Sequence, residues 1–435
     1  MKKLLLSAAF VLFCSAALSG QELKTGFFLE NNVYSYRINP AATFEEKPYT
    51  FFAIGLGNVS ATAMSNLGVS SVLYPLADKL VWGFDADIPA DTFLSKFAKD
   101  NIVLPQASVN ILSFGHQGER GRWNFEFNVR SDNYFYLSKD FFSAMKHGLN
   151  EGLSSKSGTY TFKDLNASSS NYAEAAFGYS HKIGDIVTIG GRVKFLIGLG
   201  AASVDINSFT GGASADGEDF VASSDIDLLV ATDFVKFGTQ MVGGKELYDF
   251  SDIGFNKVGF NGLGFGADLG VTVEPVDGLS IGLSALDLGF IKWNSTVNGK
   301  VKYDLKVVKD VEDALELQVA PASASVKMLN YNIHLSAKYR MPFYEGLGVG
   351  FLGTYQKYFK EARLGLDFTP ARILSLAVSG AYNNFGFDFG AALNIRFPGV
   401  NLFVGLDSVY FEMTPQFLPV SRGITNVTAG LAIAF

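Results

Sequence analysis

The sequence contains one cysteine, Cys14, in 435 residues. Cys14 falls inside a stretch with the features of a cleaved signal, so the mature chain would have no thiol. Disulfide bonds and catalysis by a cysteine nucleophile are then excluded. A lipoprotein signal ending at Cys14 is an alternative. Such signals resemble Leu-x-Gly/Ala-Cys, however, and Phe13 is too large for the position before the cysteine.

Charged side chains are also scarce. They make up 18% of the chain, against about 25% in soluble proteins, and the mean hydropathy is +0.19. A chain this apolar lacks the low hydrophobicity and high net charge of a disordered protein. Its formal charge of −7 offers no basic surface to a nucleic acid, so no nucleic-acid partner is expected.

Long apolar runs are missing beyond the N-terminus. No stretch of the mature chain reaches the roughly 18 apolar residues of a transmembrane helix. The N-terminus has two lysines, then the ten-residue apolar run Leu4–Phe13, then small residues. Ala17 and Ser19 fit positions −3 and −1 of a cleavage site after Ser19, and cleavage after Gly20 fits nearly as well. Residues 1–20 are therefore predicted to be a secretory signal peptide.

Glycine and aromatic residues are in excess, with 46 Gly, 40 Phe and 18 Tyr. They follow a period of two. From Leu263 to Glu274, apolar residues occupy one set of alternate positions, and glycine, threonine and acidic residues occupy the other. This alternation indicates a β-strand with one apolar and one polar face. It recurs over 122–130, 192–199, 330–340 and 385–397.

The alternating segments run for about 9–16 residues, whereas strands of soluble proteins average about five or six. A strand that crosses a membrane at a tilt near 45° needs about 9–11 residues. Long alternating strands without helices are the signature of a transmembrane β-barrel. We therefore predict an all-β fold, a transmembrane antiparallel β-barrel with lipid around it. A secreted soluble β-sandwich is the competing interpretation, but it would not concentrate Phe and Tyr on the apolar face.

The alternating pattern leaves the number of strands open between fourteen and sixteen. Fifteen strand starts can be counted, whereas a single-chain bacterial barrel normally has an even number. We expect fourteen strands, with sixteen as the alternative, and the ambiguous stretch is 207–261. The starts lie near residues 51, 106, 122, 171, 186, 219, 262, 279, 326, 346, 361, 373, 385, 400 and 424.

The expected organisation has three parts: the signal peptide, an N-terminal periplasmic or plug-like segment at 21–50, and the barrel at 51–435. Short turns rich in Gly, Pro and Asp alternate with longer polar loops, as in barrels with periplasmic turns and external loops. Two stretches depart from the strand pattern. Short amphipathic helices are expected at Asp140–Gly152 and Lys306–Gln318.

The polar faces of the strands carry acidic and basic residues in similar numbers. An outward charge near the membrane midplane would cost about 2–4 kcal/mol, so these side chains are expected to face the lumen. There they would cross-link one another and a plug, or line a solute path. The predicted lumen-facing residues are Glu126, Arg130, Arg192, Lys194, Asp268, Glu274, Lys338, Arg340, Arg363, Asp367, Asp388 and Arg396.

The last ten residues, 426–435, alternate between polar or small and apolar side chains and end on Phe435. This ending resembles the terminal signature that the outer-membrane barrel assembly machinery reads. The resemblance implies that Phe435 is an assembly signal and that this machinery is a partner.

Several internal segments resemble known outer-membrane families. Tyr36–Ala42 resembles the Asn-Pro-Ala element of the FadL-type transporters of hydrophobic compounds and of the related PorV-like barrels. Asp287–Trp293 resembles a strand motif of Bacteroidetes barrels of that broad group. With Leu112–Gly115 and Gly190–Phe195, the order of segments is similar to that of an uncharacterised Bacteroidetes family of predicted outer-membrane proteins. The similarity covers most of the mature chain.

The resemblance implies a plug that contains Asn39, Pro40 and Ala41, because the N-terminal segment of FadL-type proteins forms a hatch inside the barrel. Pro40 fits such a place, since it interrupts strand pairing. The implied function is a FadL-like barrel that passes hydrophobic or small solutes across the outer membrane of a Gram-negative bacterium, with a hydrophobic small molecule as a possible ligand. The alternative is a non-transporting structural or secretion and surface-assembly barrel, as PorV-like proteins are.

The sequence offers no enzyme motif. The histidines His116, His147, His181 and His334 are scattered, with no spacing that would hold a metal. No Gly-x-Ser-x-Gly nucleophile motif occurs. No catalytic activity, metal or cofactor is therefore expected.

Overall fold

A computed structural model describes residues 23–435, apart from 31, 45–46, 56, 77–78, 148–158, 214–219, 233–234, 243–244, 256–258, 295–296, 309–323 and 408–422. The signal peptide and Cys14 lie outside the described residues. Among the residues described, no helix is both long and apolar enough to cross a membrane.

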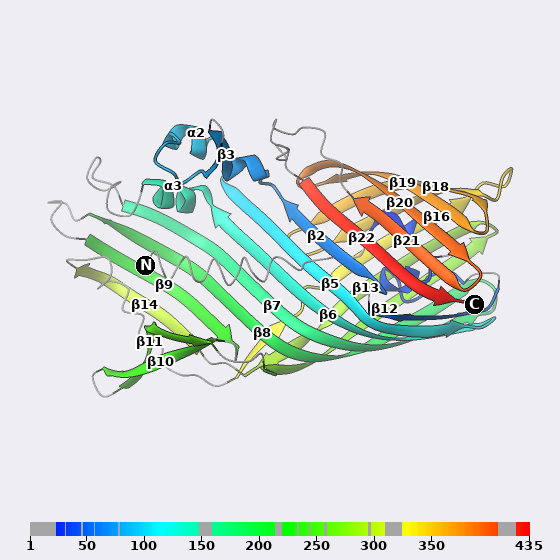
Figure 1. The fold of residues 1–435 in the computed structure, drawn as a ribbon, viewed down its shortest axis with the longest axis horizontal. Helices are drawn as coiled ribbons and strands as arrows, with labels where there is room; N and C mark the ends of the chain where they lie inside the picture. Colours follow the sequence, from blue (N-terminus) through cyan, green and yellow to red (C-terminus); the bar gives the residue numbers. More distant parts are fainter. Residues whose placement is uncertain are drawn as a thin grey trace.

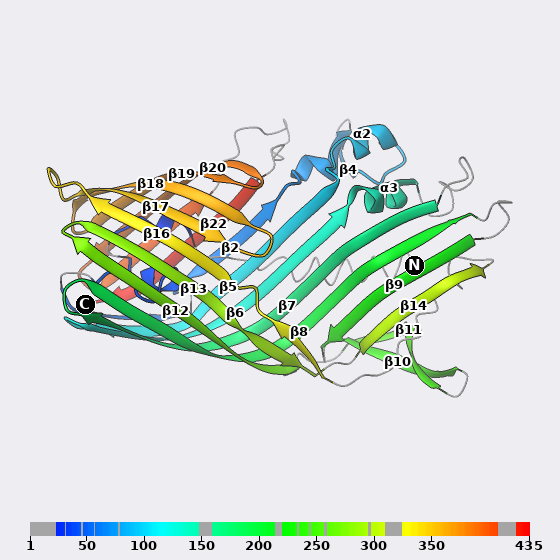
Figure 2. The ribbon, with the colours of Figure 1, turned by 180° about the vertical axis from the view of Figure 1, so that it is seen from behind.

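The strands close into an antiparallel barrel with fourteen positions, which confirms the expected number (Figures 1 and 2). The first position is shared by β1 (Tyr49–Ile54) and β2 (Val59–Ser65), which both pair with β5 on one side and β22 on the other. The eighth is shared by β15 (Ser325–Met328) and β16 (Asn332–Arg340), which both pair with β13. The other twelve positions are β5 (Asp100–Gln117), β6 (Gly121–Ser138), β7 (Thr159–Ile183), β8 (Val187–Ala213), β12 (Gly262–Val276), β13 (Leu279–Trp293), β17 (Leu347–Tyr355), β18 (Lys360–Ala371), β19 (Leu374–Asn383), β20 (Gly386–Phe397), β21 (Val400–Asp407) and β22 (Gly423–Ala434).

The surplus candidate strand near residue 219 is β9 (Phe220–Ala231), which lies outside the ring. β8 pairs with β12 as far as Gly198 and with β9 from Ala201 onward. β9 in turn pairs with β14 (Val297–Val308), so the sheet extends beyond the barrel at one end (Figure 1). A separate hairpin, β10 (Val235–Val242) and β11 (Lys245–Phe255), follows β9.

Several strands are longer than expected. β7 has 25 residues and β8 has 27, so parts of the predicted loops are strand. The extension was missed because its sequence does not alternate: Ser168–Asn171 is four polar residues in a row, and all four lie in β7. The period-two signal depends on two faces with different surroundings, and it is weak where both faces are polar.

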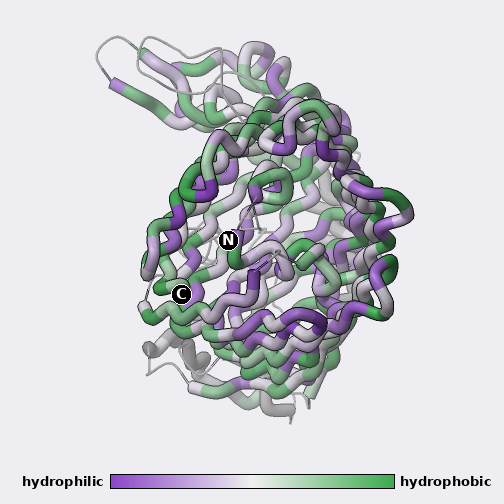
Figure 3. The backbone as a smooth tube through the Cα atoms, turned by 90° about the vertical axis from the view of Figure 1, so that its right-hand side faces the viewer, coloured by the Kyte–Doolittle hydropathy of each residue, from purple (hydrophilic) through white to green (hydrophobic). Residues whose placement is uncertain are grey.

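The two faces of the barrel wall differ as the alternation predicts. On β12, Leu263, Phe265 and Leu269 are more than half exposed on the outside, whereas Asp268 and Thr272 are buried on the inside. Figure 3, turned by 90°, looks into the ring and shows hydrophobic positions around the wall. Exposed apolar and buried polar side chains are the reverse of a soluble protein, and they match a wall surrounded by lipid.

A small cluster sits at the barrel end opposite the C-terminus. It contains β3 (Leu73–Leu76), β4 (Lys79–Trp82), α2 (Ala90–Leu94) and α3 (Lys139–His147), packed around Phe93 and other buried aromatic residues (Figure 1). α3 agrees with the helix expected at Asp140–Gly152 as far as His147, and residues 148–152 lie outside the described residues. The helix expected at Lys306–Gln318 is wrong at its start, because residues 306–308 belong to β14, and its remainder lies outside the described residues.

One irregularity of the wall positions a functional side chain. Asp287 in β13 has φ of 60°, and the pairing of β12 with β13 shifts between Ala267 and Leu269 beside it. The Asp287 amide donates to the Asp268 carboxylate, with N and Oδ1 2.7 Å apart. Asp tolerates this left-handed conformation better than most residues. The resulting bulge directs the Asp287 carboxylate toward the lumen.

Candidate functional site

The chain from Leu23 to Ala42, called here the N-terminal segment, lies inside the barrel. It contains the short 3₁₀ helices η1 (Thr25–Phe27) and η2 (Ser35–Arg37), and none of its described residues belongs to a β-strand. Val33 and Tyr36 have no exposed surface. The segment contacts inward-facing residues of strands on opposite sides of the ring, as set out below, so it occupies the lumen between them.

The Asn39-Pro40-Ala41 motif rests on three glycines of the wall, Gly190, Gly270 and Gly282, called here the glycine cradle. A Cβ on Gly190 would lie 2.5 Å from the Pro40 carbonyl oxygen, and a Cβ on Gly270 would overlap Asn39 Oδ1. Only glycine permits this close approach.

Hydrogen bonds hold the motif in the cradle. Asn39 Nδ2 donates to Thr272 Oγ1 at 3.0 Å, and the Ala41 amide donates to Asn39 Oδ1 at 2.9 Å. Arg122 donates to the Ala42 carbonyl at 2.9 Å. The motif is therefore fixed to the wall by both shape and polar contacts.

A second attachment lies near the start of the segment. The Lys24 amide donates to Asp407 at 2.8 Å, and the Thr25 amide and hydroxyl also donate to that carboxylate. Arg363, fully buried, pairs with Asp407 at 3.1 Å and with Glu361 at 2.9 Å. The aromatic ring of Phe28 fills the space over two further wall glycines.

The third attachment joins the segment to a buried group of charges. Arg37 Nε donates to Glu126 at 2.7 Å, the Tyr36 hydroxyl donates to the same carboxylate at 2.9 Å, and Arg192 pairs with it from the other side. Arg37 was not among the predicted lumen residues, because it lies on no alternating strand. Its place in the Asn-Pro-Ala element was the only signal.

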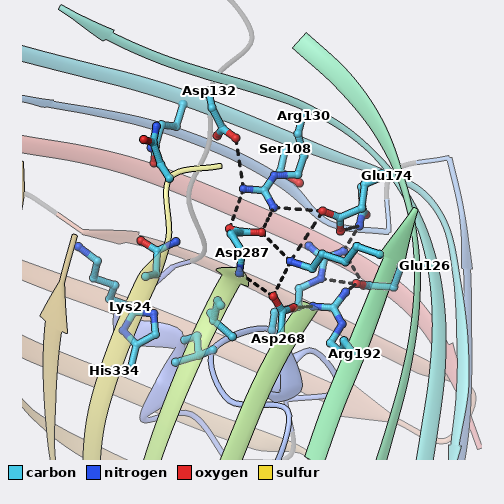
Figure 4. Close-up of a pocket in the computed structure, with 18 residues that line it drawn as sticks. Lys24, Ser108, Glu126, Arg130, Asp132, Glu174, Arg192, Asp268, Asp287 and His334 are labelled. Atoms are coloured by element: carbon cyan, nitrogen blue, oxygen red, sulfur yellow. Dashed lines mark hydrogen bonds and ion pairs between the residues drawn. The ribbon is translucent and has the colours of Figure 1, made fainter. Parts of the chain in front are cut away.

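The charges continue along the wall. Arg130 makes a two-pronged bond to Asp287, at 2.7 and 3.0 Å, and pairs with Glu174 at 3.1 Å. Lys194 pairs with Asp287 at 2.6 Å and with Asp268 at 2.7 Å. Figure 4 shows these side chains converging from neighbouring strands. The charge network comprises Arg37, Glu126, Arg130, Asp132, Glu174, Arg192, Lys194, Asp268 and Asp287.

Five of the twelve predicted lumen-facing residues lie in the charge network. Three members outside the segment, Asp132, Glu174 and Asp287, were missed. Asp132 lies in β6 beyond the last residue of the alternation that ends at Arg130. Glu174 shares its inward face with Tyr172 and Ala176, so the alternation could have identified it. Asp287 sits at a bulge, where the period of two breaks down. The five predicted residues that the network brings together are Glu126, Arg130, Arg192, Lys194 and Asp268.

The other predicted residues lie elsewhere on the interior. Glu274 pairs with Lys182 at 3.3 Å near the short turns. Arg396 lies over the Tyr49 ring, 4.7 Å from its centre, and Asp388 is buried and accepts a bond from Asn383. The remaining ones are Lys338, Arg340 and Asp367, which gather around Glu30, and Arg363, described above.

Glu30 attaches the segment at the short-turn end of the barrel. Its carboxylate pairs with Arg340 and, at 3.6 Å, with Lys338. Burial alone would raise the pKa of Glu30, but the two positive charges outweigh it and hold the pKa below its usual value. The pair is about 30% exposed, so it contributes no more than about 1 kcal/mol to stability.

A pH-dependent stability follows from Glu30. Because the pKa of Glu30 is lowered in the folded state, the negative charge contributes fully to stability above the ordinary glutamate pKa. This contribution is lost as the pH falls through the folded-state pKa. Glu30→Gln should therefore lower the urea midpoint of unfolding at neutral pH and have a smaller effect near pH 3, below the ordinary glutamate pKa. A Glu30→Gln effect of equal size at both pH values would contradict this origin.

A cavity of about 80 Å³ lies between the N-terminal segment and the wall. The charge network forms one side, and Lys24 and His334 lie on the other (Figure 4). Its lining holds five cationic and five anionic side chains, with neutral polar residues from β5 and the approach to β16. Among the described residues, no group of three or more side chains is arranged to hold a metal ion.

Phe435 lies at the seam where the barrel closes. Its backbone exchanges two hydrogen bonds with Thr50, at 2.7 and 3.0 Å, and its ring is 74% exposed on the outside. The predicted role as an assembly signal leads to an expected result. Phe435→Ala should reduce the amount of assembled barrel in cells severalfold, measured on unheated gels, and leave refolded protein equally stable. Phe397→Ala, another exposed phenylalanine at a strand end, is the control and should assemble normally.

Solved structures with a similar course of the chain include a FadL homologue and two toluene transporters. A FadL homologue of Pseudomonas aeruginosa is 11% identical, with 96% of each chain covered and a TM-score of 0.46. The Pseudomonas putida toluene transporter TodX is 11% identical, covering 97% of this chain and 96% of that one, with a TM-score of 0.43. The Ralstonia pickettii toluene transporter TbuX is 10% identical, covering 96% and 98%, with a TM-score of 0.42.

No curated protein sequence matches the chain. A family model does match, over residues 40–407, which include the Asn-Pro-Ala motif from Pro40 and most of the barrel wall. The chain therefore belongs to DUF5723, a family of unknown function.

Proposed function

We propose that this protein is an outer-membrane barrel that passes small solutes through its lumen when the N-terminal segment shifts. The observation that carries the proposal is that the lumen is occupied by a chain segment whose described residues take no part in strand pairing. Its movement would break side-chain contacts and leave the hydrogen bonds of the wall intact. A closed barrel with a movable internal segment is a suitable construction for a gated pore.

The chemistry of the cavity bears on the kind of solute. Ten of its eighteen lining residues are charged, and Ile38 and Leu286 are the apolar ones. A hydrophobic solute would gain little from such a lining. Its apolar surface would displace water from the charged side chains and offer them no hydrogen bonds in return. The small-solute form of the expected function is therefore favoured over the hydrophobic one.

Solute entry into liposomes tests the proposal. The mature protein, the same protein lacking residues 21–42, and empty liposomes are compared by the rate of swelling in small solutes. Swelling above the empty control is expected, and it should be faster without the segment. A shift in gel mobility on boiling first establishes that each form is a folded barrel. If folded barrels of both kinds admit no solute, the transport proposal is wrong.

A second candidate function, surface assembly, is favoured by one observation. β7 and β8 have 25 and 27 residues, whereas about 9–11 suffice to cross a membrane, and β9 and β14 widen the sheet beyond the barrel. Replacing the chain between β8 and β12 by a short loop should leave solute entry unchanged. If it also removes specific proteins from the cell surface, as mass spectrometry of surface-released peptides would show, the assembly role is supported.

A further inference from the structure

The cavity beside the charge network has every charge in its lining already paired. Lys24 lies 3.7 Å from Glu361, and Asp132 lies 3.5 Å from Arg130 while accepting a bond from the Tyr172 hydroxyl at 2.5 Å. The other charged side chains of the lining belong to the charge network, and each has a partner of opposite charge within 2.6–3.8 Å. The five positive and five negative groups cancel.

This pairing disfavours a charged solute. An ion in the cavity would have to take a partner from one of the internal pairs, and separating a buried pair leaves an uncompensated charge. An ion that took no partner would lose its hydration without replacement. A solute without net charge meets neither difficulty.

Some polar atoms of the lining lack a hydrogen-bond partner among the described residues. Gln106 on β5 lines the cavity and is 7% exposed, and its buried Oε1 atom accepts no hydrogen bond from the described part of the chain. The buried Nε atom of Arg192, whose terminal nitrogens are paired, likewise donates to no described residue. His334 contacts Thr354 through Nδ1 at 3.1 Å, which leaves Nε2 for another partner. The lining thus offers an acceptor on one wall and a donor on another, and a hydroxyl group can satisfy either.

We propose that this cavity is the selectivity site of the pore and that it takes small neutral solutes rich in hydroxyl groups, of the size of a three- or four-carbon polyol. The inference rests on the proposed function and adds the class of solute. Size agrees with it, because a volume of about 80 Å³ holds roughly six water-sized groups at about 10–15 Å³ each. Glycerol has six non-hydrogen atoms.

Three solutes with the same carbon skeleton provide the test: glycerol, the anion glycerate, and serinol, which carries one amino group as a cation. Their entry is measured by swelling of liposomes that contain the full mature chain, with the lipid contribution subtracted. The same measurement is made with Gly270→Ala, which keeps the whole chain but displaces the segment. Glycerol should enter at least about tenfold faster than either ion, since each ion must disturb a buried pair.

Two variants connect the preference to the cavity. Gln106→Met keeps the volume and removes the acceptor, and it should slow glycerol entry about fivefold, the effect of one hydrogen bond. Thr428→Val is the matched control: Thr428 is a buried lumen residue of β22 that does not line the cavity. It should leave the rate unchanged.

The outcomes separate this inference from the proposed function. If neither the full chain nor Gly270→Ala admits any of the three solutes, the transport function itself is wrong. If all three enter at equal rates, or an ion enters fastest, transport stands and the neutral-solute site is wrong. A Gln106→Met rate equal to that of the unaltered chain also overturns the site.

Discussion

Replacing Glu126 by glutamine is expected to lower the free energy of unfolding by about 3–5 kcal/mol. Glu126 has no exposed surface, and its carboxylate joins the N-terminal segment to the wall, with Arg37 on one side and Arg192 on the other. Glutamine has the same shape but no charge. The two buried guanidinium groups would then lose the negative charge that they share, although Arg37 would still donate to Asn128 and Arg192 would still pair with Asp268.

The loss of stability is measured by unfolding the refolded barrel in urea. The folded fraction is read from the mobility of unheated samples on a gel. Asp185→Asn is the matched control, because it makes the same carboxylate-to-amide change in a pair that is exposed. Asp185 is 93% exposed and lies 3.9 Å from Arg120. Its removal should change stability by no more than about 1 kcal/mol. Similar small changes in both variants would show that the charge network does not hold the segment.

Adding one methyl group at Gly270 is expected to displace the Asn39-Pro40-Ala41 motif. The new Cβ would overlap Asn39 Oδ1 and lie 3.0 Å from the Ala41 amide nitrogen. Neither atom can retreat freely, because Asn39 is bonded to Thr272 and the Ala41 amide to Asn39 itself. Overpacking of this kind costs about 1–3 kcal/mol. The equilibrium between the docked and the displaced segment should therefore shift toward the displaced form by about five- to a hundredfold.

Two measurements follow the displacement: protease cleavage within residues 23–42 in folded protein, and the rate of solute entry into liposomes. Both should rise in Gly270→Ala. Gly266→Ala on the same strand is the control, since its Cβ would meet Leu329 and Lys194 at the ordinary distances of 3.5 and 3.6 Å. If the segment remains protected in Gly270→Ala, the cradle does not fix its position.

The glycine cradle and Glu126 attach the N-terminal segment to the wall at different places. The glycine cradle holds the Asn39-Pro40-Ala41 motif by close steric fit against the backbone of the wall. Glu126 holds the segment by ion pairs inside the lumen. Glu30 adds a weaker attachment, about 30% exposed, at the short-turn end. Because the attachments are separate, the segment can be loosened at one of them while the others hold. Partial release of this kind would open the cavity without expelling the segment.

The sequence alone determined the architecture of the wall. Alternation is a local property with a fixed period, and a lipid exterior makes its two faces chemically opposite. For that reason the fold class, the fourteen positions and the inward direction of residues such as Arg192 and Asp268 could be predicted. The same reasoning failed where both faces carry polar side chains, as at Ser168–Asn171 in β7, and at the Asp287 bulge.

Only the tertiary structure decided which groups meet inside the barrel. Arg130 and Asp287 are 157 residues apart, and Glu126 and Arg37 are 89 apart, so the pairs depend on barrel closure and on the path of the N-terminal segment. That path follows no repeating pattern, and no residue spacing encodes that Gly190, Gly270 and Gly282 converge on one motif. The wall follows from a short-range rule, whereas the lumen is built from long-range contacts, and it is the lumen that holds the candidate site.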